Sequence, residues 1–185
     1  MVATETPGVE MGFAAPAFDL PGVDGRRHRL ADLRGEKGTL VMFICNHCPY
    51  VKAVLDLIVR DARELAGHGV ASVAIASNDT VAFPDDSFEN MQRIAREKDL
   101  PFPYLFDDSQ DVARAYGAVC TPDFFGFDAD LGLKYRGRLD ESRTQSVPGA
   151  RRDLFDAMVR IAESGTGPEE QIPSIGCSIK WKDTG

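Results

Sequence analysis

The chain has 185 residues, of which 43% are hydrophobic and 27% are charged, and its formal net charge is -8. This composition is typical of a soluble globular domain, and the length suffices to bury a core without disulfides or structural metals. The negative charge argues against nucleic acid or an anionic membrane as a partner, because both require a basic surface.

The first residues, 1–7, show neither a basic start nor an apolar run, and no stretch approaches the roughly 20 apolar residues that a membrane span needs. We therefore expect a single cytoplasmic domain over 1–185, with a flexible N-terminus at 1–10 and a C-terminal tail at 164–185. Four cysteines are too few for a disulfide framework, so in a reducing cytoplasm they are expected to be catalytic, metal-binding or inert.

The first half of the chain reads as a hairpin followed by a β-α-β unit. Turn residues between two short runs predict a hairpin over 17–30. The apolar run 39–44 predicts a buried strand, the apolar spacing that follows predicts a helix over about 50–66, and 70–76 predicts a second buried strand. Two strands joined by such a helix form a parallel pair.

The second half is predicted to continue the sheet with antiparallel strands. Asp86 and Glu89 are spaced as a capping box for a helix that reaches about Lys98. The remaining predicted elements are a short strand at 104–106, a helix at 109–116, strands at 124–127 and 134–138, and a helix at about 151–163. The result is an α/β domain with a mixed sheet flanked by helices.

Two cysteines, Cys45 and Cys48, stand where the first buried strand turns into a helix. Unpaired backbone N–H groups at a helix N-terminus favour negative charge, and the thiolate is the reactive form of cysteine. A C-x-x-C pair near a β-α-β pattern is typical of a redox motif. We predict that Cys45, nearer the helix start and the surface, is the nucleophile, and that Cys48 is the more buried resolving thiol. His47 as an imidazolium would stabilise the Cys45 thiolate.

Several segments together resemble the peroxiredoxin-like group of thioredoxin-family proteins, within the alkyl hydroperoxide reductase/thiol-specific antioxidant superfamily. They are 15–20, 43–52, 120–125, 135–140 and 173–182, and the resemblance spans about residues 10–182. The resemblance implies a thioredoxin-like fold with an N-terminal hairpin extension and no cofactor. It also implies that the Thr121–Pro122 bond is cis and faces the C-x-x-C pair, with the Thr121 backbone turned outward to pair with an extended substrate segment.

The family patterns are not all present. Peroxiredoxins have Pro seven residues and Thr or Ser three residues before the peroxidatic cysteine, and counting back from Cys48 these positions hold Val41 and Cys45. The arginine of that site would have to be Arg136 or Arg138. Thioredoxin carries a buried acid behind its cysteine pair, but the strand 39–44 has no carboxylate, so the sequence identifies no proton acceptor for Cys48.

The two other cysteines are harder to interpret. Cys120 precedes Thr121-Pro122 and is interpreted as a small buried residue, with a third thiol near Cys45 or Cys48 as the alternative. Cys177, in an apolar stretch of the tail, is interpreted as structural, with a resolving cysteine supplied by the C-terminus as the alternative.

The predicted function is thiol-disulfide exchange through a Cys45–Cys48 disulfide, with a protein or small-molecule disulfide as substrate and a thiol as reductant. A second hypothesis is a thiol peroxidase, in which one of the two cysteines attacks peroxide and the sulfenic acid condenses with the other. A third is a copper- or zinc-binding module that uses Cys45, His47 and Cys48, with or without Cys120. The absent Thr favours disulfide exchange over peroxide reduction.

Overall fold

A five-stranded mixed sheet forms the centre of the computed structural model, which describes residues 2–183. The strand order is β6-β5-β4-β8-β9, in which β4, β5 and β6 are parallel and β8 and β9 are antiparallel to their neighbours. Their bounds are β4 Gly38–Phe43, β5 Val70–Ala76, β6 Tyr104–Phe106, β8 Asp123–Asp128 and β9 Leu133–Arg136. The predicted mixed α/β sheet is confirmed.

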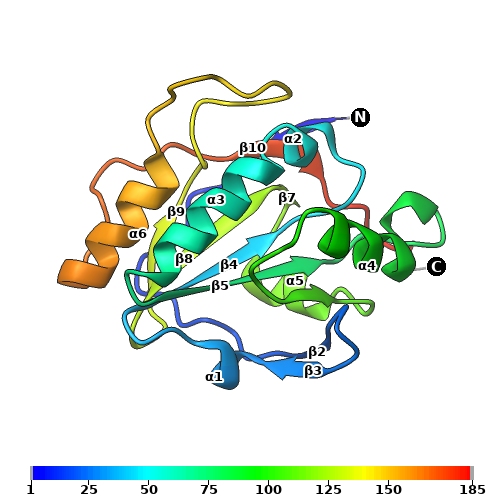
Figure 1. The fold of residues 1–185 in the computed structure, drawn as a ribbon, viewed down its shortest axis with the longest axis horizontal. Helices are drawn as coiled ribbons and strands as arrows, with labels where there is room; N and C mark the ends of the chain where they lie inside the picture. Colours follow the sequence, from blue (N-terminus) through cyan, green and yellow to red (C-terminus); the bar gives the residue numbers. More distant parts are fainter. Residues whose placement is uncertain (1, 184–185) are drawn as a thin grey trace.

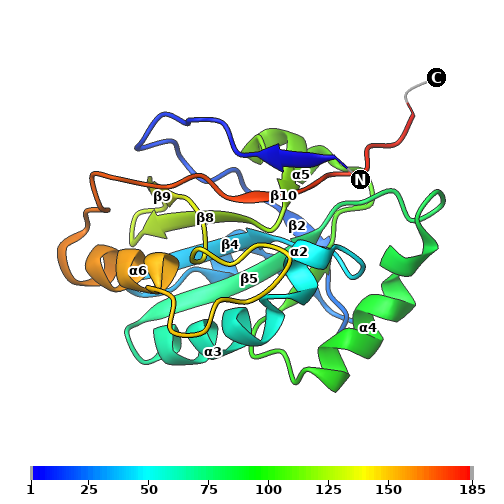
Figure 2. The same cartoon turned by 90° about the horizontal axis from the view of Figure 1, so that it is seen from above.

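Helices cover both faces of this sheet. Figures 1 and 2 show α3 (Leu55–Ala66) and α6 (Asp153–Ser164) on one face and α5 (Asp111–Tyr116) on the other. The remaining elements of this part are α1 (Leu30–Leu33), α2 (Pro49–Lys52), α4 (Phe88–Glu97) and the hairpin β2 (Asp19–Pro21) and β3 (Arg27–Arg29). The order of strands and helices is that of the thioredoxin-like fold with an N-terminal hairpin.

The central strand β4 is buried along its whole length because it contacts a core on each side. Leu40 and Met42 pack in the core beneath α3 and α6, whereas Val41 and Phe43 pack in the core on the α5 side. This alternation follows from the two-residue repeat of a strand, and it explains why the sequence shows a continuous apolar run rather than an alternating one. Packing on both faces therefore fixes the C-terminal end of β4, and the cysteine segment follows directly after that end.

A second, smaller sheet joins the two ends of the chain. Its order is β1-β10-β7, with bounds Ala3–Glu5, Ile175–Ser178 and Cys120–Thr121, and both pairings are antiparallel. The expectation of a flexible N-terminus at 1–10 was wrong for residues 3–5, which form a strand. Residues 1 and 184–185, which belong to the expected flexible end and tail, lie outside the described residues.

Two predicted helix boundaries were wrong. The helix expected over about 50–66 is divided into α2 and α3 near Ala53 and Val54. Ser87, not Asp86, caps α4, since the Ser87 hydroxyl accepts a hydrogen bond from the Asn90 N–H at 3.3 Å. Asp86 instead ends a single 3-10 turn at Pro84–Asp86 and is buried. A buried carboxylate needs partners, and these lie in the cysteine segment.

A buried ion pair fixes the start of β8, next to Pro122. Arg136 donates to Asp123 through Nε and Nη2, at 3.2 and 2.9 Å, and both side chains are almost fully enclosed. Burial raises the pKa of Asp123, and the guanidinium opposes this by favouring the charged carboxylate. The ion pair therefore joins β8 to β9 directly after Pro122.

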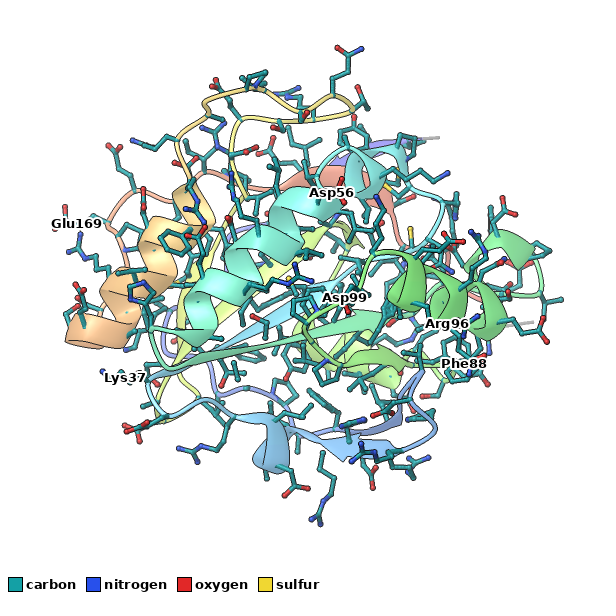
Figure 3. The ribbon with its side chains drawn as sticks, viewed as in Figure 1. Lys37, Asp56, Phe88, Arg96, Asp99 and Glu169 are labelled. Atoms are coloured by element: carbon teal, nitrogen blue, oxygen red, sulfur yellow. The ribbon has the colours of Figure 1, made fainter. Side chains whose placement is uncertain are left out.

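Charged side chains occupy the outer faces of the helices (Figure 3). Asp56 of α3 pairs with Lys98 at 3.0 Å, and Arg63 of α3 pairs with Asp99 at 2.9 Å. Exposed pairs of this kind contribute little stability each. Within residues 2–183, no helix combines the length and the apolar composition needed to cross a bilayer.

Candidate functional site

The segment Cys45–Cys48 connects β4 to α2. The Ile44 N–H still bonds to the Ile75 carbonyl at 3.0 Å, after which the chain leaves the sheet. Cys48 is the N-cap of α2: its carbonyl accepts the Lys52 N–H at 2.9 Å, and Pro49 occupies the first helical position. The helix therefore begins directly after the second cysteine, not after the first.

Three sulfur atoms gather at this turn. The Sγ of Cys45 lies 3.3 Å from the Thr121 hydroxyl, and the Sγ of Cys48 lies 3.2 Å from the Thr121 carbonyl oxygen. The Sγ of Cys48 is also 2.7 Å from the Sγ of Cys177, which comes from β10. Cys45, Cys48 and Cys177 are 3%, 0% and 2% exposed, so all three reactive atoms are enclosed by the protein. We call these three residues the thiol cluster.

The two cysteines of the C-x-x-C pair have opposite acidities. The hydrogen bond from Cys45 lowers the pKa of Cys48 to about 5 against the effect of burial, and hydrogen bonds from Cys177 and Thr121 act in the same direction. The pKa of Cys45 is raised well above its usual value by its hydrogen bond with Cys48, by burial and by the nearby Asp86 carboxylate. The surroundings of the pair therefore favour the charged form of Cys48 and the neutral form of Cys45.

These pKa directions are opposite to those expected for a Cys45 thiolate, and the exposed fractions of Cys45 and Cys48, 3% and 0%, differ little. Cys45 is buried, and the groups that surround it favour its neutral form. His47 lies within 4.8 Å of the Cys45 sulfur, but its Nδ1 is 2.5 Å from a carboxylate oxygen of Asp86. The imidazole thus has a carboxylate as its nearest charged neighbour, which the sequence did not indicate.

Asp86 is the functional residue that the sequence analysis missed. One of its oxygens accepts the backbone N–H groups of Asn46 and His47, at 2.8 and 3.3 Å, and the other accepts the Asn78 amide at 2.9 Å. The Tyr104 hydroxyl donates to the Asn46 side chain at 3.0 Å, which fixes the same segment from the other side. Asp86 supplies the buried acid that strand 39–44 lacks, and only the fold brings it to the cysteines.

The structure groups a different metal-ligand set from the one expected. The donor atoms of Cys45, His47 and Asp86 all lie within 4.8 Å of one another. Asp86 already accepts three N–H groups, and these would compete with a metal for its oxygens. Cys120, which the metal hypothesis added, has its sulfur 3.7 Å from the Pro122 carbonyl oxygen, and burial raises its thiol pKa.

The expected site residues Thr121 and Pro122 lie against the thiol cluster. Their peptide bond is cis, and Thr121 is buried. The edge of β7 is already occupied, because Thr121 is paired with Cys177 and Cys120 with Ser178 of β10. An external segment could therefore pair with Thr121 only after β10 moves away.

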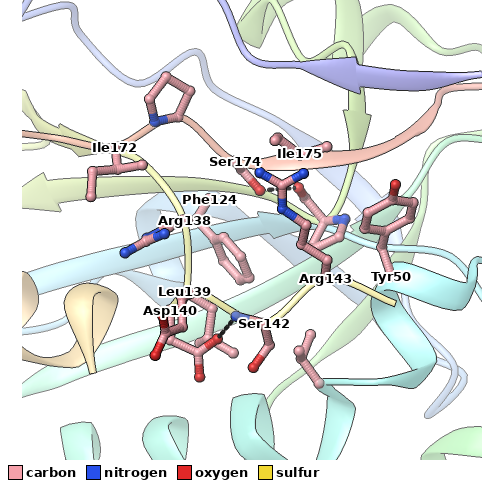
Figure 4. A pocket seen from close by; sticks show the side chains of 14 residues that line it. Tyr50, Phe124, Arg138, Leu139, Asp140, Ser142, Arg143, Ile172, Ser174 and Ile175 are labelled. Carbon is pink, nitrogen blue, oxygen red and sulfur yellow. Dashed lines mark hydrogen bonds between the residues drawn. The ribbon is translucent and has the colours of Figure 1, made fainter. Parts of the chain in front are cut away.

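A hollow lies between α2, the loop at Pro122 and the start of β10 (Figure 4). It is lined by Tyr50 of α2, by Pro122, and by Ser174 and Ile175 at the start of β10, and the Ser174 hydroxyl donates to the Pro122 carbonyl at 2.8 Å. Arg143 extends over it from the loop before α6. Tyr50, Pro122 and Ile175 each lie within two residues of a cysteine in the sequence, so the hollow lies at the ends of the segments that carry the thiols.

The two arginines considered for peroxide chemistry are engaged elsewhere. Arg136 is held by Asp123 and by the Gly117 carbonyl, and its guanidinium lies 4.5 Å from the centre of the Phe125 ring. Arg138 lines the hollow and donates to Asp153 at 2.7 Å. Both guanidinium groups are therefore paired with carboxylates, Arg136 with Asp123 and Arg138 with Asp153.

A cysteine pair at a strand-to-helix turn, facing a proline loop in a thioredoxin-like fold, defines a thiol redox protein. The model of the AhpC/TSA family matches residues 11–136, and the chain belongs to this family. The family and the geometry of the site both indicate thiol redox chemistry. Both are compatible with a disulfide and with a peroxide as the substrate.

Similar proteins include representatives of both chemistries. "Thiol-disulfide oxidoreductase ResA" of Geobacillus thermodenitrificans is 29% identical over 138 residues, which is 71% of each chain. "Putative peroxiredoxin MT2597" of Mycobacterium tuberculosis is 28% identical over 124 residues, 66% of this chain and 73% of that one. A solved structure, an uncharacterized conserved protein from Geobacillus kaustophilus, is 48% identical with a TM-score of 0.94, over 100% of this chain and 99% of that one.

The acidity of Cys48 gives the first prediction. In the reduced protein, the ultraviolet absorbance of a thiolate should appear with a midpoint near pH 5 and should be lost in Cys48→Ala. In Cys45→Ala the midpoint should rise, because the hydrogen bond that most stabilises the Cys48 thiolate is removed. A thiolate signal that persists in Cys48→Ala, or appears only above pH 8, would contradict this assignment.

Asp86 gives the second prediction. Asp86→Ala leaves the N–H groups of Asn46 and His47 without an acceptor, and the free energy of unfolding should fall by about 3 kcal/mol. Asp85→Ala is the matched control: Asp85 is exposed, so the change should stay within about 0.5 kcal/mol. Urea denaturation measures both, and equal stability of the two variants would show that Asp86 does not hold the segment.

Proposed function

We propose that this protein is a thiol-disulfide oxidoreductase in which Cys45 and Cys48 form the redox-active pair. The observation that carries the proposal is the burial of both sulfurs against Thr121 of the proline loop, at 3.3 Å for Cys45 and 3.2 Å for Cys48, where the pKa of Cys48 is lowered and that of Cys45 is raised. A thiolate attacks disulfides, and a thiol two residues away can then close an intramolecular disulfide. The ResA relatives, named as thiol-disulfide oxidoreductases, support this reading.

The structure suggests the order of events. Cys48 is the attacking sulfur, because hydrogen bonds from Cys45 and Cys177 lower its pKa and so raise the fraction that is ionised at neutral pH. Its attack on a substrate disulfide, R–S–S–R, gives a mixed disulfide at Cys48 and releases one R–S⁻. Loss of the Cys48 charge removes one of the causes that raise the pKa of Cys45. Cys45 can then lose its proton and attack the Cys48 sulfur, which releases the second thiolate and leaves a Cys45–Cys48 disulfide.

His47 and Asp86 are the groups best placed to receive the Cys45 proton. Both have donor or acceptor atoms within 4.8 Å of the Cys45 sulfur. His47 is also partly exposed and lines a second hollow with Asn46 and Lys52, which gives the proton a route to solvent. The substrate is a protein or small-molecule disulfide and the reductant is a thiol, both of which would approach the cluster through the hollow beside Pro122.

A second candidate is the reduction of peroxides by Cys48. It is favoured by the low pKa of Cys48 at the start of α2 and by the relatives named as peroxiredoxins. Against it, Cys45 stands where peroxiredoxins have the hydroxyl that orients the peroxide, and Arg136 is paired with Asp123. Peroxide would convert Cys48 to a sulfenic acid, which condenses with a neighbouring thiol and releases water.

A paired oxidation experiment separates the two candidates. The fully reduced protein is mixed with stoichiometric oxidised glutathione or hydrogen peroxide, alkylated at intervals and mapped by mass spectrometry. Oxidised glutathione should be consumed faster, and Cys48→Ala should slow its consumption on the order of 1,000-fold or more, because the attacking sulfur is lost. Cys120→Ala is the control that should react as the wild type does. Fast reaction with peroxide and slow reaction with glutathione disulfide would reverse the order of the candidates.

A further inference from the structure

The last strand, β10, brings Cys177 from the C-terminal end of the chain onto Cys48. The pairing of Cys177 with Thr121 in the β7–β10 ladder directs the Cys177 side chain at the C-x-x-C turn, and the two sulfurs are 2.7 Å apart. The backbone N–H of Tyr50, in α2, is a further hydrogen-bond partner of the Cys177 sulfur. Cys48 thus has two thiols in contact with it, Cys45 from its own turn and Cys177 from β10.

Gly176 lets β10 pass unusually close to the proline loop. A Cβ at this position would lie 2.0 Å from the Thr121 carbonyl oxygen and 3.1 Å from the Pro122 nitrogen. Backbone atoms cannot give way as a flexible side chain can, so any larger residue would force the strands apart. The absence of a side chain at position 176 is what allows the neighbouring Cys177 to reach Cys48.

The strand is held at both ends. Before it, the Ser174 N–H donates to the Thr6 hydroxyl at 3.2 Å, and the Ser174 hydroxyl donates to the Pro122 carbonyl at 2.8 Å. After it, the Lys180 N–H donates to the Asn78 side chain, and the Lys180 carbonyl accepts from Gln110, both at 2.9 Å. These hydrogen bonds fix the position of β10, and with it the position of Cys177.

We propose that Cys177 is a third redox residue, which forms a disulfide with Cys48 inside the oxidised protein. The proposal deepens the proposed function and rests on it. After Cys48 has attacked a substrate disulfide and formed a mixed disulfide with one half of it, the Cys177 thiolate attacks the Cys48 sulfur. The Cys48–Cys177 bond forms, the second substrate thiolate leaves, and the Cys177 proton goes to solvent. In sum, two protein thiols are oxidised and one external disulfide is reduced to two thiols.

Oxidation of Cys48 also prepares Cys177 for this attack. Burial, the hydrogen bond with Cys48 and the charge on Cys48 together raise the pKa of Cys177 to about 12, and Lys180 acts in the opposite direction. Once Cys48 is part of a mixed disulfide, it no longer carries a negative charge. The hydrogen bond with Cys48 and the charge on Cys48 then raise the pKa of Cys177 less than before. Cys45 can later attack Cys48 and release Cys177, which moves the disulfide to Cys45–Cys48 without any net transfer of electrons.

The test isolates Cys177 by removing its competitor. Reduced Cys45→Ser is mixed with one equivalent of oxidised glutathione, alkylated and digested with trypsin. We expect peptide 38–52, which contains Cys48, to be found joined to peptide 161–180, which contains Cys177. The glutathione adduct of Cys48 should disappear at least about tenfold faster than in Cys45→Ser/Cys177→Ser, because the second attack is intramolecular. An adduct that lasts equally long in both proteins would overturn the proposal.

A variant that keeps every thiol tests the role of the strand. In the Cys45→Ser background, Gly176→Ala should displace β10 and slow formation of the Cys48–Cys177 bond at least about tenfold, while Cys48 still acquires glutathione. Gly8→Ala is the matched control, since a Cβ there meets no atom within 4 Å and the fold around it should be unaffected. If the Cys48–Cys177 bond forms equally fast in the Gly176→Ala and Gly8→Ala variants, the close passage of β10 is not what brings Cys177 to Cys48.

A third reagent separates failure of this inference from failure of the proposed function. Diamide, an azodicarboxamide, oxidises two neighbouring thiols to a disulfide and is itself reduced to the hydrazine, so it does not depend on glutathione exchange. If glutathione disulfide fails to modify Cys48, the proposed function is wrong. A Cys48–Cys177 bond after diamide treatment of Cys45→Ser would still support the third redox residue, and its absence would overturn it.

Discussion

The close passage of β10 over the Thr121–Pro122 peptide is the constraint on which the site depends. It places the Cys177 sulfur 2.7 Å from that of Cys48 and fills the β7 edge that would otherwise be open to an extended segment. Only glycine at position 176 permits this distance between backbones. The protein therefore carries, on its own C-terminal strand, a thiol at the position that pairs with Thr121.

The second determinant is the placement of one negative charge among buried thiols. A thiolate in an enclosed site is costly unless hydrogen bonds stabilise it, and hydrogen bonds from the thiols of Cys45 and Cys177 lower the pKa of Cys48. The pKa of Cys45 is raised by its hydrogen bond with Cys48 and by burial, and the nearby Asp86 carboxylate acts in the same direction. Cys45 and Cys48 are buried to nearly the same degree, so burial alone does not explain why their pKa values shift in opposite directions. The difference comes from the groups that surround each sulfur.

The sequence was sufficient for the fold class and for the elements that carry the cysteines, because a buried strand followed by a helical apolar face has few interpretations. It was insufficient wherever the answer depended on contacts between distant segments. Asp86 was interpreted as a helix cap from its spacing to Glu89, whereas the fold uses it to bind Asn46 and His47. Cys177 was interpreted as structural, since nothing local to the tail indicates that residues 175–178 pair with the proline loop.

The central claim is that Cys48 is the sulfur through which this protein exchanges electrons, with Cys45 and Cys177 as its partners. The most direct test is NMR of the wild-type protein with ¹³C-labelled cysteine Cβ atoms, because this signal reports the oxidation state of each cysteine separately. After one equivalent of oxidised glutathione, the account predicts that the Cys48 signal moves completely to the disulfide range, that the remaining change is shared between Cys45 and Cys177, and that Cys120 stays reduced. A Cys48 signal that remains in the thiol range while another cysteine is oxidised would contradict the account.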